Sequence, residues 1–119
     1  MDKREKGRSG EQLARDFLLE RGMTLLAENY CARGGEIDLI LADGDALVFV
    51  EVKTRYSNRY GSPLEAVTAA KMRNVIRTAQ KYIHDNGLYG KNVRFDVVGI
   101  DRGQIEYIKN AFDASGYWG

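Results

Sequence analysis

The sequence predicts a single α/β domain in which a mixed central sheet is flanked by helices. Segments with the helical spacing of apolar residues alternate with segments rich in β-branched and aromatic residues, in the order helix, three strands, helix, two strands. This alternation is typical of α/β folds. The chain has 119 residues, of which 44% are hydrophobic and 29% are charged. These values favour one folded domain over residues 1–119 and exclude a disordered chain.

The first helix is expected to begin at Ser9. Gln12 follows at the spacing of a capping box, in which each of the two side chains accepts a backbone N–H of the other residue. Apolar residues at helical spacing predict the buried face: Leu13, Ala14, Phe17 and Leu18. Gly22 ends the helix, because glycine readily adopts the left-handed conformation that follows helix C-termini.

Three strands are expected after this helix. The first covers residues 24–29, and a glycine-bearing loop follows at residues 32–35. Residues 36–42 and 46–53 are rich in Ile, Leu, Val and Phe and are separated by a short Asp-Gly-Asp segment. Two such runs joined by a short polar segment predict a β-hairpin.

The second helix is expected to carry Pro63 in its first turn, where proline is favoured. Its apolar stripe has helical spacing and consists of Met72, Ile76, Ala79 and Ile83. Asn86 and Gly87 end the helix, and two further strands follow at residues 93–100 and 104–109.

Charge and composition exclude several classes of protein. Lys and Arg total 18 and Asp and Glu total 17, so a polyanionic partner has to be held by a local basic patch. The single cysteine, Cys31, excludes an intramolecular disulfide and a cysteine-rich zinc site. The longest apolar run, residues 46–50, is too short to span a membrane, and the N-terminus lacks the apolar stretch of a signal peptide. We therefore expect a cytoplasmic protein with no membrane partner, in which residues 1–8 form a flexible basic segment and residues 113–119 a tail.

Three charged residues interrupt the hairpin strands. Asp38 lies in the second strand, and Glu51 and Lys53 lie in the third. Charged side chains in buried strands are costly unless they are paired or bind a metal. If the central Gly-Asp pair forms a two-residue type II′ turn, the numbers of paired residues add up to 89, so Asp38 lies opposite Glu51. Strand periodicity places Lys53 on the same face as Glu51.

This arrangement predicts a site for metal-assisted phosphodiester hydrolysis. Two carboxylates that face each other destabilise a sheet unless a cation lies between them. Oxygen ligands with spare coordination positions suit Mg²⁺ or Mn²⁺, and the backbone carbonyl of Val52 is a candidate further ligand. Lys53 is placed to donate to a phosphate or to orient the attacking water. Glu11, in the first turn of the first helix, is a candidate outer member of the site.

Other charged residues permit two interpretations each. Asp38, Glu51 and Lys53 could instead form a surface salt-bridge cluster on an exposed sheet face. Glu36 could bind the metal or stabilise its loop, and Asp96 could support the fold or pair with a basic residue.

The basic residues of the second helix form a candidate phosphate-binding surface. Arg73, Arg77 and Lys81 recur every four residues, which places them on one helix face. Together with Lys71 and Arg55 they are the candidate nucleic-acid-binding residues; a solvated face is the alternative.

The sequence resembles the YraN family of small bacterial proteins over about residues 7–112. The matching features are Gly10-Glu11 with Ala14, Asn29, the segment 35–40 (Gly-Glu-Ile-Asp-Leu-Ile), the segment 49–55 (Phe-Val-Glu-Val-Lys-Thr-Arg), Lys71 and the segment 94–98 (Arg-Phe-Asp-Val-Val). The hairpin residues within these segments resemble the core motif of the PD-(D/E)XK nuclease superfamily, which includes restriction enzymes and archaeal Holliday-junction resolvases. One departure is that Ile37 precedes Asp38, where the superfamily motif has proline.

The resemblance implies a restriction-endonuclease-like αβββαβ core. It also implies metal ligation by Asp38 and Glu51, a catalytic role for Lys53 and a helix acid at Glu11. The expected function is a Mg²⁺-dependent or Mn²⁺-dependent endonuclease acting on DNA, with structured or branched DNA in repair or recombination as the expected substrate. The alternatives are a catalytically silent nucleic-acid-binding module that acts with a partner and a metal-binding scaffold without nucleic acid. The sequence does not decide whether the substrate is DNA or RNA. It also leaves the oligomeric state open, and a homodimer is one of the options.

Overall fold

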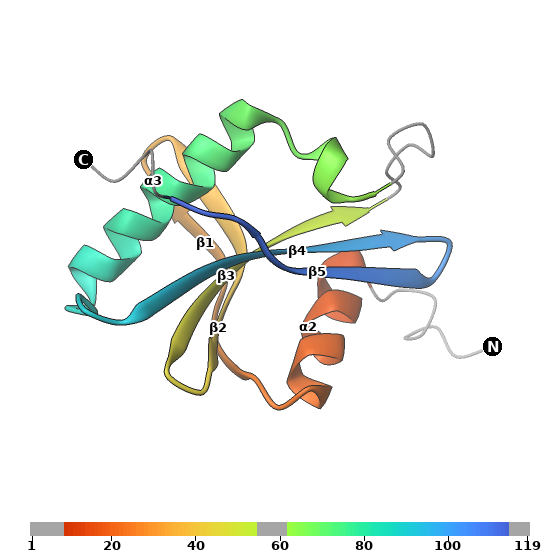
Figure 1. Ribbon diagram of the computed structural model, residues 1–119, viewed down its shortest axis with the longest axis horizontal. Coiled ribbons are helices and arrows are strands. Elements are labelled where there is room, and N and C mark those ends of the chain that lie inside the picture. Colours follow the sequence, from red (N-terminus) through yellow and green to blue (C-terminus); the bar gives the residue numbers. More distant parts are fainter. Residues whose placement is uncertain (1–8, 55–61, 115–119) are drawn as a thin grey trace.

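The computed structural model describes residues 9–54 and 62–114 (Figure 1). In chain order its elements are α2 (Gly10–Glu20), β1 (Thr24–Ala32), β2 (Gly35–Asp43), β3 (Ala46–Thr54), the short 3₁₀ helix η2 (Leu64–Ala66), α3 (Ala69–Asp85), β4 (Asn92–Asp101) and β5 (Gln104–Phe112). The predicted order of one helix, three strands, a helix and two strands is therefore confirmed.

The five strands form one mixed sheet in the order β1-β2-β3-β4-β5. Neighbouring strands are antiparallel except for β3 and β4, which are parallel. Parallel neighbours need a long crossover connection, and α3 lies in that connection. The predicted α/β class with a mixed sheet is confirmed.

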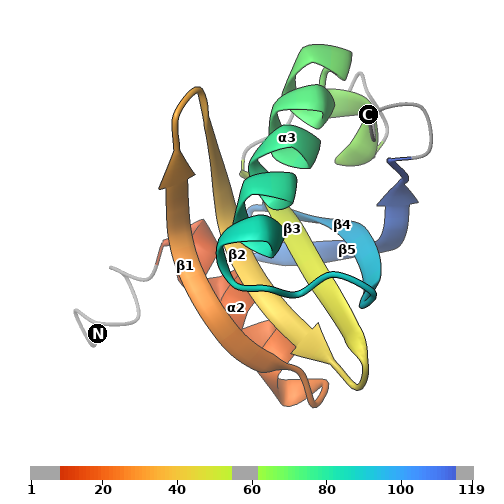
Figure 2. The same ribbon diagram turned by 90° about the vertical axis from the view of Figure 1, so that its left-hand side faces the viewer.

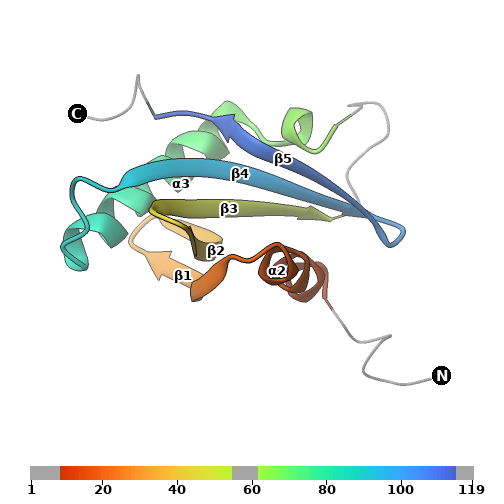
Figure 3. The same ribbon diagram turned by 60° about the horizontal axis from the view of Figure 1, so that its bottom comes forward.

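The two long helices cover opposite faces of the sheet (Figures 2 and 3). The core on the α3 side is formed by Ile37, Ile40, Leu47, Phe49, Val75, Ile76, Ala79, Ile83, Phe95 and Ala114. The core on the α2 side is formed by Ala14, Leu18, Met23, Leu39, Leu41, Val48, Val50, Val98 and Ile100. The molecule thus has three layers, and β2 and β3 contribute apolar side chains to both cores.

Local signals in the sequence place the start of α2 correctly. The Ser9 hydroxyl accepts the backbone N–H of Gln12 at 3.1 Å, and the Gln12 side chain accepts the backbone N–H of Ser9 at 2.9 Å. Both hydrogen bonds of the predicted capping box are therefore present. Gly22 has a φ of 96°, which is the left-handed conformation expected after this helix.

The hairpin has the predicted turn and register. Asp43 pairs with Ala46 and Leu39 pairs with Val50, so the residue numbers add up to 89 along the ladder. Gly44 has a φ of 58°, whereas Asp45 has a negative φ, and this combination is typical of a type II′ turn.

The first strand is longer than predicted because it continues through Asn29. The sequence suggested an end at this residue, but pairing with β2 resumes at Tyr30 and extends to Ala32. Asn29 has a φ of 49° and lies across from Asp38, between two paired positions. Near this point the alternation of side chains between the two faces of β2 also changes. Ile37 and Ile40 are three positions apart and yet belong to the same core, whereas a regular strand would place them on opposite faces. A single left-handed residue therefore lets both strands continue with altered side-chain directions.

The start of the second helix was predicted too early. Pro63 precedes η2, which is separate from α3. Val67, with extended backbone angles, divides the two, and α3 begins after Thr68, whose hydroxyl accepts the backbone N–H of Lys71 at 3.1 Å. Threonine is a preferred N-cap residue, and this signal outweighed the proline.

The last strand, and the packing that follows it, continue further along the chain than expected. β5 extends to Phe112, and Ala114, which we expected in a tail, is only 4% exposed in the α3-side core. The rest of that tail, residues 115–119, and the basic segment 1–8 lie outside the described residues.

Asp96 stabilises the fold. It is fully buried, and its carboxylate accepts hydrogen bonds from the guanidinium of Arg94 and the hydroxyl of Tyr107. It also accepts the backbone N–H of Asn110 at 2.8 Å, where the β4–β5 register shifts and Asn110 has a φ of 54°. Both possibilities for Asp96 are thus realised, because it supports an irregular strand and pairs with a basic residue.

No described helix is long and apolar enough to span a membrane.

Candidate metal centre

Asp38 lies where the β2–β3 ladder ends. The last paired position is Leu39 with Val50, and Asp38 and Glu51 come next in the same register. The Oδ2 atom of Asp38 accepts the backbone N–H of Val52 at 2.8 Å. The carboxylate therefore occupies the gap between the diverging strands and replaces a ladder hydrogen bond.

Glu51 is a buried carboxylate with incomplete hydrogen bonding. It is 5% exposed and lies two residues after Phe49, which packs in the α3-side core, so its side chain points toward α3. Its Oε2 atom lies 3.7 Å from Nζ of Lys71 on α3. Its Oε1 atom is buried and has no hydrogen-bond partner. A buried carboxylate oxygen of this kind is costly unless a cation or a proton is present.

The surroundings of Glu51 favour its protonated form. Burial raises the pKa of Glu51 most, and the negative charge of Asp38 and a side-chain hydrogen bond with Asp38 raise it further, to about 8. The positive charges of Lys71 and Lys53 act in the opposite direction. Two adjacent carboxyl groups therefore share a site where a cation would allow both to be ionised.

Lys53 is half-buried and lies two residues after Glu51 on the same strand. Its ammonium group is close enough to lower the pKa of Glu51. The predicted grouping of Asp38, Glu51 and Lys53 is present in the structure.

Glu11 approaches Asp38 from the α2 side. Burial raises the pKa of Glu11, and the charges of Asp38, Glu36 and Glu28 raise it further. Its Oε1 atom is buried without a hydrogen-bond partner. The start of α2 is held close to the end of β3, since a Cβ on Gly10 would lie 2.0 Å from the Thr54 side chain.

The donor set fits a hard divalent cation that keeps several waters. Within residues 9–54 and 62–114 no three His, Cys, Asp or Glu side chains are grouped closely enough to hold a metal ion. A metal here would therefore have two protein carboxylates, Asp38 and Glu51, and would complete its coordination with backbone oxygen and water, as Mg²⁺ commonly does. The unpartnered oxygen of Glu51 is the observation that such an ion would explain.

Glu36 lies near Glu11, since its negative charge adds to the effect of burial on the pKa of Glu11. Glu36 is exposed and accepts a hydrogen bond from the thiol of Cys31 at 3.5 Å, so it stabilises the β1–β2 turn region. Gly35 is close to α3, because a Cβ there would lie 2.1 Å from Oγ1 of Thr78; this glycine serves helix packing. Arg55 lies outside the described residues.

The basic surface of α3 faces away from the sheet. Arg73, Arg77 and Lys81 are all exposed, and the ammonium of Lys81 lies 3.2 Å from Asp85. Lys71 differs from them because it reaches Glu51. Sequence reasoning assigned Lys71 to phosphate binding and missed this contact. The sequence signal that could have predicted this contact is the N-cap residue Thr68, which places Lys71 in the first turn of α3.

Comparison with known proteins identifies the family. The profile of the uncharacterised protein family UPF0102 matches residues 10–100. A UPF0102 protein of Rhodococcus jostii is 49% identical over 111 residues, which cover 89% of this chain and 94% of that protein. A UPF0102 protein of Chromohalobacter salexigens is 48% identical over 95% of this chain and 94% of that protein. A UPF0102 protein of Symbiobacterium thermophilum is 48% identical over 93% of this chain and 98% of that protein. These matches confirm the resemblance to the YraN family, and the chain belongs to the uncharacterised protein family UPF0102.

Proposed function

We propose that this protein is a Mg²⁺-dependent or Mn²⁺-dependent endonuclease that hydrolyses phosphodiester bonds in DNA. The observation that carries the proposal is the buried oxygen of Glu51, which lacks a partner beside the carboxylate of Asp38 and near the ammonium of Lys53. A purely structural cluster would satisfy its buried polar atoms, as the network around Asp96 does.

The fold supports placing the chain in the PD-(D/E)XK superfamily. The order helix, three strands, helix, strand is the order of the superfamily's αβββαβ core, with β5 as an addition. The acidic pair and Lys53 lie on neighbouring strands of the hairpin, as the resemblance implies. The superfamily assignment and the nuclease activity are parts of the same proposal.

Each residue of the centre has a distinct part in the proposed reaction. Asp38 and Glu51 would hold the cation, and the carbonyl of Val52 leaves the strand on the same side as the N–H that Asp38 accepts. The cation, when bound, would polarise a phosphoryl oxygen and lower the pKa of water. Lys53 would donate to the scissile phosphate or orient the attacking water, and Glu11 would add negative charge on the α2 side.

A nucleic-acid substrate needs local positive charge for its phosphates, because the chain has a net charge of only +1. Arg73 and Arg77 supply exposed positive charge on α3, the helix whose first turn carries Lys71 to the centre. Structured or branched DNA, as in repair or recombination, is the substrate class that the resemblance favours.

The test combines metal calorimetry with cleavage assays. Wild type is incubated with Mg²⁺ or Mn²⁺ and with branched, flapped, single-stranded and double-stranded DNA. Asp38→Asn and Glu51→Gln should each weaken metal binding and remove cleavage, because a neutral amide replaces an anionic ligand. Lys53→Ala should keep metal binding and slow cleavage by about 10²-fold. Glu20→Gln, an exposed change at the end of α2, is the matched control and should behave as wild type.

Two outcomes contradict the proposal. Cleavage that persists in Asp38→Asn and Glu51→Gln would point to a contaminating nuclease. Wild type that binds metal and nucleic acid but cleaves none of the substrates would instead be the binding module considered above.

A further inference from the structure

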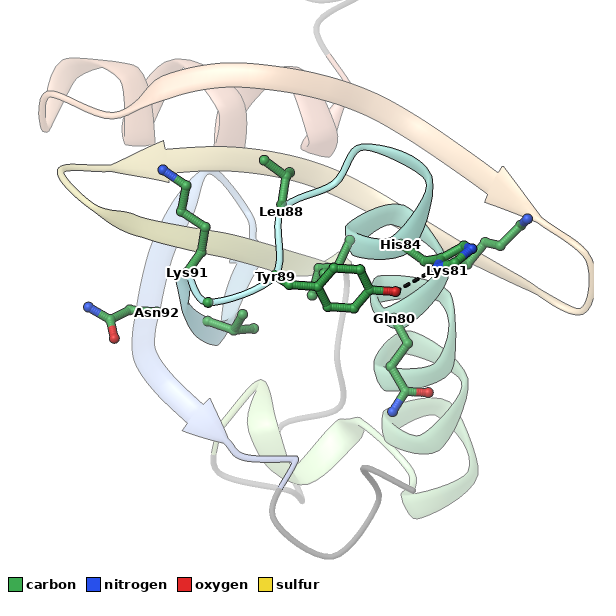
Figure 4. Close-up of a pocket in the computed structure, with 10 residues that line it drawn as sticks. Gln80, Lys81, His84, Leu88, Tyr89, Lys91 and Asn92 are labelled. Carbon is green, nitrogen blue, oxygen red and sulfur yellow. Dashed lines mark hydrogen bonds between the residues drawn. The ribbon is translucent and has the colours of Figure 1, made fainter.

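A pocket of about 740 Å³ lies between the C-terminal end of α3, the loop that follows it and the start of β4 (Figure 4). The start of β4 pairs with the start of β3, so the pocket lies at the opposite end of β3 from Glu51. Its apolar lining residues are Ile83, Leu88 and Val93, and its polar ones are Gln80, Lys81, His84, Tyr89, Lys91 and Asn92.

The loop after α3 presents Tyr89 to solvent. Gly87 and Gly90 both have left-handed backbone angles, with φ of 63° and 88°, and turn the chain on either side of Leu88 and Tyr89. Leu88 packs against the α3-side core, and its N–H donates to the carbonyl of Ile83 at 2.9 Å. Tyr89 points outward and is 69% exposed.

The ring of Tyr89 contacts His84. Its hydroxyl is hydrogen-bonded to Nδ1 of His84, and the two rings meet edge to face with centroids 6.0 Å apart. Figure 4 shows the ring extending toward His84 and Lys81, with Lys91 and Asn92 on its other side. An exposed aromatic ring whose hydroxyl already has a partner is suited to stacking, because that contact reduces the side-chain freedom that is lost when a flat ligand binds.

Two lysines, Lys81 and Lys91, line the pocket together with Tyr89. Lys91 is exposed, and none of residues 9–54 and 62–114 forms an ion pair with it. The charge of Lys81 is partly neutralised by Asp85, at 3.2 Å. No acidic side chain from the described part of the chain lines the pocket. A smaller pocket of about 70 Å³, between Arg73 and Arg77, shares Gln80 with it and continues the basic surface along α3.

We propose that this pocket binds one nucleotide unit, with the base stacked on Tyr89 and the phosphate held by Lys91. The side-chain amides of Gln80 and Asn92 can donate to and accept from the edge of a base. A flat apolar surface combined with the exposed ammonium of Lys91 matches a nucleotide better than it matches an acidic peptide, which offers charge without a ring.

The proposal deepens the proposed function and rests on it in one respect, since it takes the nucleotide to belong to a strand of the substrate. From Lys71 to His84 α3 rises by about 20 Å, and the exposed side chains of Arg73 and Arg77 lie between them. A single strand that follows α3 would thus connect the candidate metal centre to the pocket. The pocket would hold an unpaired part of the substrate, because a base has to be unstacked to reach Tyr89.

The experiment measures binding without metal, so that cleavage plays no part. Fluorescence anisotropy follows a labelled oligodeoxythymidine in the presence of EDTA, and calorimetry follows thymidine 5′-monophosphate. The variants are Tyr89→Ala, Tyr89→Phe and Lys91→Ala, with Lys109→Ala on β5 as the matched loss of an exposed lysine.

Tyr89→Ala should weaken binding by about fivefold or more, since stacking on an aromatic side chain is lost. Tyr89→Phe keeps the ring and should stay within about threefold of wild type. Lys91→Ala should weaken binding and reduce the slope of log affinity against log salt by about 0.7, whereas Lys109→Ala should not. The same dependence on Tyr89 for thymidine 5′-monophosphate would mean that a free nucleotide is sufficient; dependence for the oligonucleotide alone would mean that the strand is required.

Binding that is unchanged in Tyr89→Ala, or equally weakened by Lys91→Ala and Lys109→Ala, would overturn the proposal. So would competition by polyglutamate at the concentration at which thymidine 5′-monophosphate competes. Glu20→Gln, the exposed change at the end of α2, should retain Tyr89-dependent binding. A protein that binds through Tyr89 but never cleaves would contradict the endonuclease proposal and support this nucleotide site. Cleavage together with binding that does not depend on Tyr89 would support the endonuclease and contradict the nucleotide site.

Discussion

The ammonium group of Lys71 lies 3.7 Å from Oε2 of Glu51 and joins α3 to β3 at the candidate metal centre. The contact gives a buried carboxylate a partial counter-charge at the place where a divalent cation would bind. Lys71 lowers the pKa of Glu51, against the effects of burial and of Asp38. It would also repel a bound cation. These two effects on metal binding have opposite signs, and pH decides which is larger.

Lys71→Ala should therefore make metal binding more dependent on pH. Near pH 6 the variant should bind Mg²⁺ more weakly than wild type, because the pKa of Glu51 rises further and a proton competes with the metal. Near pH 9 the difference should shrink, because deprotonation of Glu51 then costs less and the variant lacks the repulsion between Lys71 and the cation. Calorimetric titration at both pH values measures the change, with Lys81→Ala as the control on the same helix. Parallel pH profiles for Lys71→Ala and wild type would show that the contact has no influence on the centre.

The raised pKa of Glu51 predicts how stability depends on pH in the absence of metal. The folded state holds a proton on Glu51 up to about pH 8, whereas the unfolded state releases it near 4.5. The free energy of unfolding should therefore fall as pH rises from about 4.5 to about 8, and Glu11, whose pKa is also raised, acts in the same direction.

Glu51→Gln should flatten this decline. Urea denaturation at pH 5 and at pH 8.5 measures the difference, with Glu20→Gln as the exposed control. A pKa that differs by one between the folded and unfolded states corresponds to about 1.4 kcal/mol. A decline of equal size in Glu51→Gln and wild type would show that other groups cause it.

Asp96→Ala should destabilise the protein by about 3–5 kcal/mol, because Arg94 would lose a buried counter-charge and Asn110 would lose its acceptor. Urea denaturation measures the loss. Asp85→Ala, which removes only the exposed partner of Lys81, should change stability by about 0.5 kcal/mol or less. A small effect of Asp96→Ala would mean that the β4–β5 hairpin is held mainly by its apolar contacts.

Gly35→Ala should destabilise the protein by about 1–3 kcal/mol, since its Cβ would lie 2.1 Å from Oγ1 of Thr78. Thr78→Ala removes the clashing atom, and the double variant should lose less stability than the two single variants predict by addition. Thermal unfolding of the four proteins tests this. Strict additivity would show that the two residues do not interact.

Arg73 and Arg77 give a separate prediction for nucleic acid. If each contacts a phosphate, each alanine variant should reduce the slope of log affinity against log salt by about 0.7–0.9. Anisotropy titrations over a range of salt concentrations measure it, and Lys109→Ala serves again as the control. Identical slopes for all the variants would mean that this face of α3 is only solvated.

Those parts of the fold that local sequence determines were predictable. The capping box at Ser9, the register set by Gly44 and the end of α3 at Asn86 each depend on residues within a few positions of one another. The register that brings Asp38 and Glu51 to the end of the β2–β3 ladder followed from the turn, although the last paired residues are Leu39 and Val50. Errors arose where a partner distant in sequence decides the structure. β1 continues past Asn29 because β2 pairs with it, and Lys71 reaches Glu51 because α3 packs over the sheet.

The buried oxygen of Glu51 also has a consequence for laboratory evolution. A carboxyl group that must be neutralised to fit its surroundings should lower the stability of the metal-free fold at neutral pH, so its replacement by an uncharged residue is expected to raise heat resistance. A library of variants selected only for survival at high temperature should therefore accumulate changes at position 51, while Asp96 is retained. Heat resistance and the capacity to bind a cation would then compete at a single side chain.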